Sequence, residues 1–295
     1  MDASPSLELS GLTESTRRPA PSRIGSREFE WGRRTYLMGI INVTPDSFSG
    51  DGLVRGDGAS VPAALEQAQR MADEGADILD VGGESTRPGH QPVSTEEELE
   101  RVLPVISAIR AALPGMPLSV DTTKPRVAEA ALDAGADLIN DIWGVRRSDE
   151  MAVLAAARGA PLVVMHHREE PRYADVVAEV VDDLRAALER AVRAGVPAER
   201  LIVDPGIGFG KEMEHNLTLL RGLGRLRALG QPILLGASRK STIGRILDLP
   251  PQERLEGTLA ISALGVAAGA DIIRVHDVQA NRRAVLVADA IIRQS

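Results

Sequence analysis

Apolar runs of strand length recur along this chain, and segments with helical periodicity separate them. Repeated strand-helix units with continuous apolar strands predict a parallel sheet whose outer faces are covered by helices. Eight such units in about 260 residues favour a (β/α)8 TIM barrel of the α/β class. The runs are YLMGIINV (36–43), ADILDVGG (76–83), PLSVDT (117–122), ADLINDIW (136–143), PLVVMH (161–166), RLIVDPGIG (200–208), PILLGAS (232–238) and ADIIRVHD (270–277).

The turns before three of these strands share one tripeptide. Gly-Ala-Asp occurs at 75–77, 135–137 and 269–271, where the glycine is expected to end a helix in the left-handed conformation and the aspartate to start the next strand. A doubly wound open sheet is the alternative architecture. Its usual dinucleotide signal, G-x-G-x-x-G after the first strand, is missing, which favours the barrel.

The N-terminal segment differs from the rest of the chain. Residues 1–28 are rich in Ser, Pro, Thr and Arg without apolar periodicity, which predicts a flexible, disordered tail. From Phe29 the sequence predicts a short hairpin that turns near Gly32 and leads into the strand at 36–43. We therefore expect a tail over 1–28 and a single domain over 29–295.

Composition excludes several classes of protein. The chain has 295 residues, 43% of them hydrophobic, which is enough for one large core, and no cysteine, which excludes disulfides and thiol nucleophiles. A net charge of -8 with 2% aromatic residues argues against nucleic acid as a partner. No apolar run approaches the roughly 20 residues of a membrane span, and no signal peptide pattern is seen. We expect a cytoplasmic protein without a membrane partner.

Polar residues stand near the carboxyl end of every predicted strand, where barrels of this kind hold their active sites. A single aspartate there more often caps the following helix, but capping explains eight such strand ends together poorly. Arg274 and His276 share one strand face, as do Ser238 and Lys240 if the strand continues that far. The residues are Asn42, Asp80, Asp121, Asn140, Asp141, His166, Asp204, Ser238, Arg239, Lys240, Arg274 and His276.

Seven motifs, in this order along the chain, resemble those of dihydropteroate synthase: MGIINVTPDSFS, DVGGESTRPG, SVDTTKP, NDI, DPGIGFGK, SRKSTIG and IIRVHDV. The resemblance covers residues 39–278. It implies condensation of 6-hydroxymethyl-7,8-dihydropterin pyrophosphate with p-aminobenzoate, giving 7,8-dihydropteroate and pyrophosphate in folate synthesis. It also implies a Mg²⁺ cofactor, a homodimer formed through the late helices, and competition by sulfonamides.

The same resemblance implies a role for each site residue. Asp204 would bind the pyrimidine amino group of the pterin, and Lys240 its carbonyl and ring nitrogen. The pterin would also contact Asp121, Asn140, Met165 and Phe209, and pyrophosphate would be bound by Asn42, Arg274 and His276, with Asn42 also a ligand of the metal. The p-aminobenzoate subsite would be lined by Pro45, Phe48, Thr86, Arg87, Pro88 and Ser238. The catalytic residues would be Arg274, His276, Lys240 and Asp46. For Met165 and Phe209, ordinary core packing is an equally good interpretation.

The implied mechanism is dissociative: the C–O bond to pyrophosphate breaks first and the aniline nitrogen then attacks. No protein nucleophile is needed, in agreement with the absence of cysteine.

Two segments depart from the family pattern: SFSGDGL, where a glycine precedes Asp51, and the short acidic MHHREEPRY. His166 and His167 are neighbours on one strand, so they point to opposite faces and are poorly placed to chelate a metal.

Two other functions remain open. A methyltetrahydrofolate:corrinoid methyltransferase shares a pterin-binding barrel but has no use for the SRK motif or a pyrophosphate clamp. A non-catalytic pterin-binding paralogue would have lost loop or anion-binding residues, and the glycine before Asp51 is the one such change seen.

Overall fold

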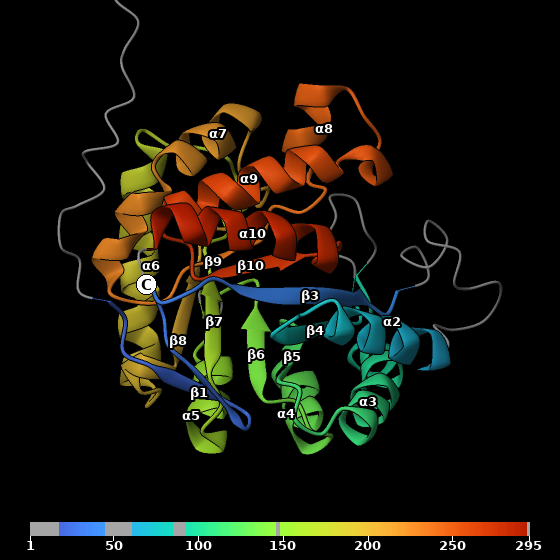
Figure 1. Cartoon of the computed structure of the whole chain (residues 1–295). Coiled ribbons are helices and arrows are strands. Elements are labelled where there is room, and N and C mark those ends of the chain that lie inside the picture. Colours follow the sequence, from blue (N-terminus) through green and yellow to red (C-terminus); the bar gives the residue numbers. More distant parts are fainter. Residues whose placement is uncertain (1–17, 45–60, 85–91, 146–147, 294–295) are drawn as a thin grey trace, which may run out of the picture.

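The computed structural model describes residues 18–44, 61–84, 92–145 and 148–293. Eight strands form one parallel sheet in the order β8-β7-β6-β5-β4-β3-β10-β9, and a parallel bridge between Val203 and Ile233 joins its two edges into a barrel (Figure 1). The eight predicted strands and the TIM-barrel fold are confirmed. The strands are β3 (Tyr36–Asn42), β4 (Ile78–Gly82), β5 (Leu118–Asp121), β6 (Leu138–Asp141), β7 (Leu162–Met165), β8 (Leu201–Asp204), β9 (Leu234–Leu235) and β10 (Ile272–Val275).

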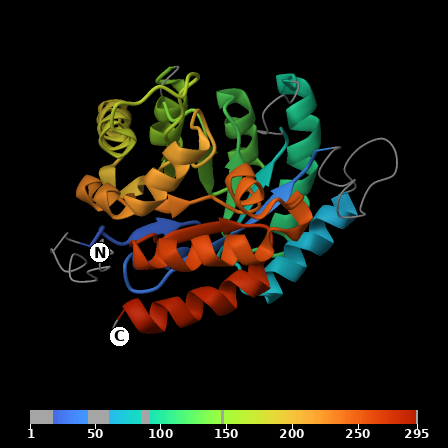
Figure 2. The same cartoon turned by 90° about the horizontal axis from the view of Figure 1, so that it is seen from above.

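Helices surround the strands, and the last helix returns to the first. The backbone N–H of Gln279 donates to Glu74 at 3.3 Å, which places α10 beside the end of α2 (Figure 2). Within the described residues, no helix is long and apolar enough to cross a membrane. The helices are α2 (Val61–Asp73), α3 (Thr95–Ala112), α4 (Pro125–Asp133), α5 (Glu150–Arg158), α6 (Val176–Arg193), α7 (Met213–Arg221), α8 (Ser241–Leu247), α9 (Leu255–Ala267) and α10 (Val278–Ile292), with 3₁₀ turns η2 (Ala198–Arg200), η3 (Leu223–Leu229) and η4 (Pro251–Glu253).

Two cores hold the barrel together. The larger lies between the strands and the helices, and the smaller fills the barrel interior. Because side chains alternate along a strand, the interior core is built from inward-facing residues of the barrel strands other than β5, and the next interior position lies closer to the carboxyl ends. The interior core comprises Ile24, Phe29, Trp31, Tyr36, Met38, Ile78, Leu138, Val163, Ile202, Leu234 and Ile272.

The N-terminal hairpin exists, but earlier than predicted. Strands β1 (Ser22–Ile24) and β2 (Arg27–Phe29) pair antiparallel around Gly25, whose φ is +58°. The chain does turn near Gly32, whose φ is +76°, but this turn leads from the hairpin into β3, so its prediction as the turn of the hairpin is wrong. Residues 22–28, expected in the tail, belong to this hairpin. Their strands have three residues each, too short for an alternating pattern to show. Its Ile24 and Phe29 join Trp31 to close the amino end of the barrel.

The three Gly-Ala-Asp turns adopt the predicted conformation, and their aspartates also bind neighbouring strands. Their glycines have φ of +96°, +113° and +95°. Each aspartate accepts a backbone N–H at the start of a strand and lies beside an arginine, which fixes the strands at the amino end. The contacts are Leu37 N to Asp77 2.9 Å, Leu118 N to Asp137 3.0 Å, Ile233 N to Asp271 3.1 Å, Arg34 to Asp77 2.6 Å, Arg110 to Asp137 2.5 Å and Arg293 to Asp271 3.7 Å.

Candidate active site

Most of the predicted site residues occupy the interior position next to the interior core. Asp80, Asn140, Asp204 and Arg274 each stand two residues after an interior core residue of the same strand. Alternation therefore points their side chains into the barrel at the carboxyl ends. By the same alternation Asn42, Asp121, Met165 and His276 face inward as well.

Arg274 is the centre of a buried ionic cluster. Its Nε donates to Oδ2 of Asp80 at 2.6 Å, and its Nη2 donates to Oδ2 of Asp121 at 2.7 Å. Asn140 Nδ2 donates to the same Asp80 oxygen at 3.1 Å. Asp80 is fully buried, and its Oδ1 has no hydrogen-bond partner among the described residues. Residues that the resemblance assigns to pterin and to pyrophosphate are thus joined through Asp80.

Burial shifts the protonation equilibria of this cluster. Desolvation raises the pKa of Asp121 to about 7, although the nearby Arg274 charge works in the opposite direction. For Arg274, burial works to lower the pKa, but the charges of Asp80 and Asp121 raise it on balance. The guanidinium therefore stays charged, while Asp121 can exchange a proton near neutral pH.

Asp204 and Lys240 form a second part of the site. Asp204 Oδ1 accepts the N–H of Gly206 at 2.7 Å, and burial raises the pKa of this carboxyl. Lys240 Nζ donates to the carbonyl of Ile207 and lies 4.0 Å from the ring centroid of Phe209. Burial lowers the pKa of Lys240 to about 8. A carboxylate and an ammonium group therefore face the interior beside an aromatic ring.

The SRK segment reaches the site by a turn and not by a strand. Strand β9 ends at Leu235, so the strand geometry does not continue to Ser238 and Lys240. Arg239 adopts a left-handed conformation with φ of +58° and is held by two hydrogen bonds to Asp277, at 2.7 and 3.0 Å. Strain of this kind is maintained where the surrounding structure fixes the backbone.

Ser238 and His276 lie together at the same end of the barrel. Ser238 Oγ and His276 Nδ1 are 2.9 Å apart, and the His276 N–H donates to Ser238 Oγ at 3.3 Å. Predicted p-aminobenzoate and pyrophosphate residues are therefore in contact. Met165 is buried on β7 and Phe209 lies under Lys240, so both are placed near the predicted pterin residues.

Two residues of the predicted strand-end set face outward. Asp141 accepts the N–H groups of Trp143 and Val145 at 2.9 and 3.2 Å, so local capping explains it. His166 Nε2 lies 3.1 Å from Asp183 Oδ2 on α6, in the layer between strands and helices. These strand-end positions belong to the scaffold because their parity is opposite to that of the site residues.

Sequence reasoning missed Lys211, the last residue of DPGIGFGK. Its Nζ lies 2.8 Å from His166 Nδ1 and donates to the carbonyls of Gly206 and Phe209, each at 3.0 Å; burial lowers its pKa to about 7. It ties the loop that carries Phe209 to the end of β7. Gly206 is essential to this packing, since a Cβ there would come within 1.9 Å of the His166 carbonyl. The motif's final lysine was the available signal.

Several predicted residues lie outside the described residues: Pro45, Asp46, Phe48, Asp51, Thr86, Arg87 and Pro88. Glu84, the last described residue before Thr86, Arg87 and Pro88, is held in place by an ion pair. Lys124 Nζ lies 2.5 Å from carboxylate oxygens of both Glu84 and the buried Glu98.

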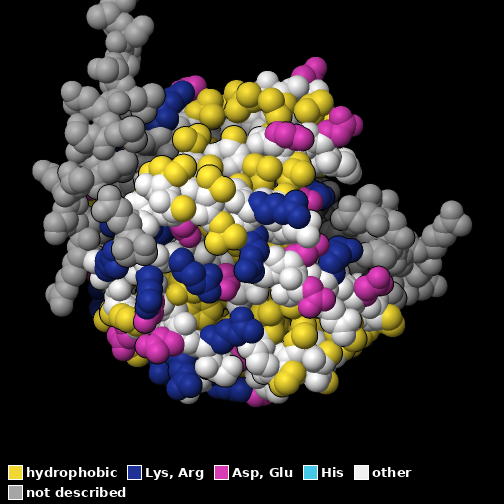
Figure 3. Space-filling model, in the orientation of Figure 1, with side chains coloured by type: hydrophobic (Ala, Val, Ile, Leu, Met, Phe, Trp, Pro, Cys, Tyr) yellow, Lys and Arg dark blue, Asp and Glu magenta, His cyan; other side chains and the backbone are white. Residues whose placement is uncertain are grey.

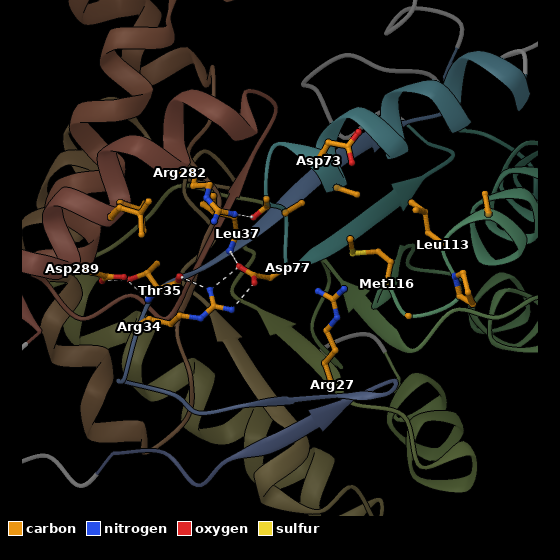
Figure 4. Close-up of a pocket in the computed structure, with 18 residues that line it drawn as sticks. Arg27, Arg34, Thr35, Leu37, Asp73, Asp77, Leu113, Met116, Arg282 and Asp289 are labelled. Atoms are coloured by element: carbon orange, nitrogen blue, oxygen red, sulfur yellow. Dashed lines mark hydrogen bonds and ion pairs between the residues drawn. The ribbon is translucent and has the colours of Figure 1, made fainter. Parts of the chain in front are cut away.

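A cavity of about 710 Å³ lies elsewhere, at the amino end of the barrel (Figure 4). Several of its polar groups are engaged in the scaffold: Arg34 pairs with Asp77, and Asp289 accepts both the N–H and the hydroxyl of Thr35 at 2.8 Å. It contains none of the interior cluster around Arg274, so the candidate active site remains at the carboxyl ends.

Comparison with known proteins identifies the family of this chain. The family model described as pterin binding enzyme matches residues 38–276. A dihydropteroate synthase of Clostridium beijerinckii is 49% identical over 92% of this chain and 100% of its own length, and that of Bacillus subtilis is 48% identical over 93% of each chain.

Solved structures give the same result. The dihydropteroate synthase of Clostridium difficile, solved in the presence of pteroic acid, has 48% identity and a TM-score of 0.86, covering 90% of this chain and 100% of that one. The Xanthomonas albilineans enzyme, solved with 7,8-dihydropteroate, has 41% identity and a TM-score of 0.84 over 94% of this chain and 100% of that one. Together with the interior cluster at the strand ends, these matches show that the chain belongs to the dihydropteroate synthase family of pterin-binding enzymes.

Proposed function

We propose that the interior cluster condenses 6-hydroxymethyl-7,8-dihydropterin pyrophosphate with p-aminobenzoate, releasing pyrophosphate and forming 7,8-dihydropteroate for folate synthesis. The observation that carries this assignment is the convergence of carboxylates, an amide and two cations on one interior face at the carboxyl ends. A pterin presents N–H donors beside carbonyl and ring-nitrogen acceptors, and each buried partner left unpaired would cost about 1–3 kcal/mol.

The pterin occupies the floor of this site. Asp204 accepts its amino group and neighbouring N–H, and Asp121 with Asn140 binds the other edge. Lys240 donates to the carbonyl and ring nitrogen, since its buried ammonium lies over the Phe209 ring and is stabilised by the nearby charge of Asp204. Met165 packs against the ring from β7.

The pyrophosphate lies at the mouth, where Arg274 and His276 supply donors. Asn42 ends β3 on the same interior side, is half-buried, and has no hydrogen bond from its side chain to a described residue. Its amide oxygen fits Mg²⁺, which takes few protein ligands and otherwise waters and phosphate oxygens. The described residues contain no cluster of three acidic or histidine side chains that could hold a metal alone, so we assign Mg²⁺ to Asn42 and the substrate. When bound, Mg²⁺ would neutralise charge on the leaving pyrophosphate.

Catalysis then consists of alignment and leaving-group stabilisation. Arg274 and His276 stabilise the charge that develops on pyrophosphate as the C–O bond breaks, and the electron-rich pterin stabilises the cation left behind. The aniline nitrogen attacks this carbon and loses a proton. Ser238 contributes to the p-aminobenzoate subsite with Pro45, Phe48, Thr86, Arg87 and Pro88, and Asp46 assists the cation; apart from Ser238 these lie outside the described residues.

Inhibition by sulfonamides follows from the same assignment. A dihydropteroate synthase from Yersinia pestis, 39% identical with a TM-score of 0.86, has been solved as a sulfonamide drug complex. We expect sulfonamides to compete with p-aminobenzoate here as well.

A homodimer is proposed through the late helices. Apolar side chains are exposed on α8, α9 and α10, and Figure 3 shows them gathered over these helices. Contiguous exposed apolar surface of this kind is typical of an interface. The side chains are Ile246, Leu247, Leu264, Leu286, Val287 and Ile291. Light scattering measures the mass directly. A cytoplasmic location remains a prediction from the sequence.

The deciding experiment measures pyrophosphate release and dihydropteroate formation with Mg²⁺, with and without p-aminobenzoate. We expect coupled formation of both products in the wild type and a loss of about 10²–10³-fold in Lys240→Ala, because a positioned donor is removed. Wild-type protein that binds pterin but forms no dihydropteroate would be the non-catalytic paralogue.

A further inference from the structure

We propose that Arg274 transfers its terminal nitrogens from Asp121 to pyrophosphate when the pterin binds, while Asp80 holds its Nε throughout. This handover rests on the proposed function and assigns a new positioning role to Asp80. It makes binding of the pterin and of pyrophosphate mutually dependent.

The geometry of Arg274 leads to this inference. Its guanidinium spans two carboxylates on neighbouring strands β4 and β5, with Nε 2.6 Å from Asp80 and Nη2 2.7 Å from Asp121. A guanidinium is planar and its donors point in fixed directions. In this orientation Nη2, one of the two terminal nitrogens that could reach a phosphate, is engaged by Asp121.

The two carboxylates differ in what else they bind. Asp80 is fully buried and also accepts Asn140 Nδ2 at 3.1 Å, so it is fixed below the ligand. Asp121 is partly exposed, and its one hydrogen bond among the described residues is the one from Arg274. A pterin N–H donor that reaches Asp121 therefore competes with Arg274 Nη2, and not with Nε.

Charge favours the same sequence of events. Three interior carboxylates, Asp80, Asp121 and Asp204, lie near three cations, Arg274, Lys240 and Lys211, so these side chains have no excess positive charge to attract an anion that arrives alone. Once the pterin donors pair with Asp121, Arg274 can direct its terminal nitrogens at the phosphates.

The test measures binding and not turnover. Isothermal titration calorimetry gives the Kd of magnesium pyrophosphate for the full chain, with and without saturating 6-hydroxymethylpterin. We expect at least about tenfold tighter binding of pyrophosphate with the pterin present, and by linkage the same factor for the pterin. An unchanged Kd in the wild type would overturn the handover.

Asp121→Asn and Asp204→Asn form a matched pair. Each removes one carboxylate charge from the same site, but Asp121 alone of the two accepts a hydrogen bond from Arg274. Without pterin, pyrophosphate should bind at least about fivefold more tightly to Asp121→Asn than to Asp204→Asn. Equal affinities would mean that charge alone acts, and would refute the proposal.

A second readout uses the wild type and does not depend on variants that fold. In ¹⁵N NMR of the guanidinium groups, with Arg274 assigned by its absence from Arg274→Lys, the Nη signals should shift on pterin addition while the Nε signal stays in place. Movement of Nε would contradict the role of Asp80. If neither probe binds the wild type, the proposed function fails; if dihydropteroate forms and both bind without coupling, the handover alone fails.

Discussion

Both ends of this barrel carry aspartate-arginine pairs, and the two sets of aspartates differ in the donors that they bind. At the amino end, Asp77, Asp137 and Asp271 each accept the N–H of a strand residue in addition to an arginine nearby. At the carboxyl end, Asp80 and Asp121 accept hydrogen bonds only from side chains among the described residues.

The difference shows what separates a structural ion pair from a functional one. A strand N–H cannot leave its acceptor without disturbing the sheet, so the amino-end carboxylates are fixed. A side-chain donor can rotate away, which leaves the carboxyl-end carboxylates available to a ligand. The residue types are the same at the two ends, and the hydrogen-bond partner distinguishes the two roles.

The largest effect is expected from exchanging arginine for lysine at each end. Arg274→Lys should lower kcat/KM by about 10²–10³-fold, because one ammonium group cannot span Asp80 and Asp121. Arg110→Lys should leave kcat/KM unchanged and reduce the free energy of unfolding by about 1–2 kcal/mol, through hydrogen bonds lost to Gly135 and Asp137. Steady-state kinetics and urea unfolding measure both. A comparable loss of activity in Arg110→Lys would remove the distinction between the two ends.

A smaller effect concerns pH. In the folded chain the pKa of Asp121 is raised from 3.8 to about 7, so between these values the folded state holds a proton that the unfolded state has released. This contribution to stability is full below the unfolded pKa and is lost as pH rises through 7. Asp121→Asn lacks it, so its free energy of unfolding relative to wild type should increase by about 4 kcal/mol from pH 4 to pH 8, at about 1.36 kcal/mol for each pKa unit. Urea titrations across pH measure the trend, and a constant difference would show that Asp121 titrates normally.

The smallest effect is expected at the surface of the amino end. Arg34 is half-exposed and binds Asp77 through two hydrogen bonds, at 2.6 and 3.1 Å. Arg34→Gln should cost at most about 1 kcal/mol, because Asp77 keeps the N–H of Leu37 and exposed ion pairs contribute little. Activity should not change. A loss above about 2 kcal/mol in thermal unfolding would indicate that the arginine, and not the backbone N–H, holds this carboxylate.

Strand number, strand position and many of the inward polar residues could be read from the sequence. Apolar runs bounded by Gly-Ala-Asp turns are local signals, and alternation places Asp80, Asn140, Asp204 and Arg274 on one face once the strands are known. The family motifs span the same residues, and the family is confirmed.

Tertiary structure decided which contacts these residues make. The short hairpin strands around Gly25 carry no periodic signal, and burial of Phe29 inside the barrel determines their place. Arg239 takes a left-handed conformation that could not be predicted from the sequence. Its partner Asp277 is 38 positions away along the chain, beyond α8 and α9, so no local pattern links the two residues. The spanning of Asp80 and Asp121 by Arg274 joins residues 194 and 153 positions apart. Periodicity reports the local face of a strand, whereas such partners are set by barrel closure, which brings the last strand against the first.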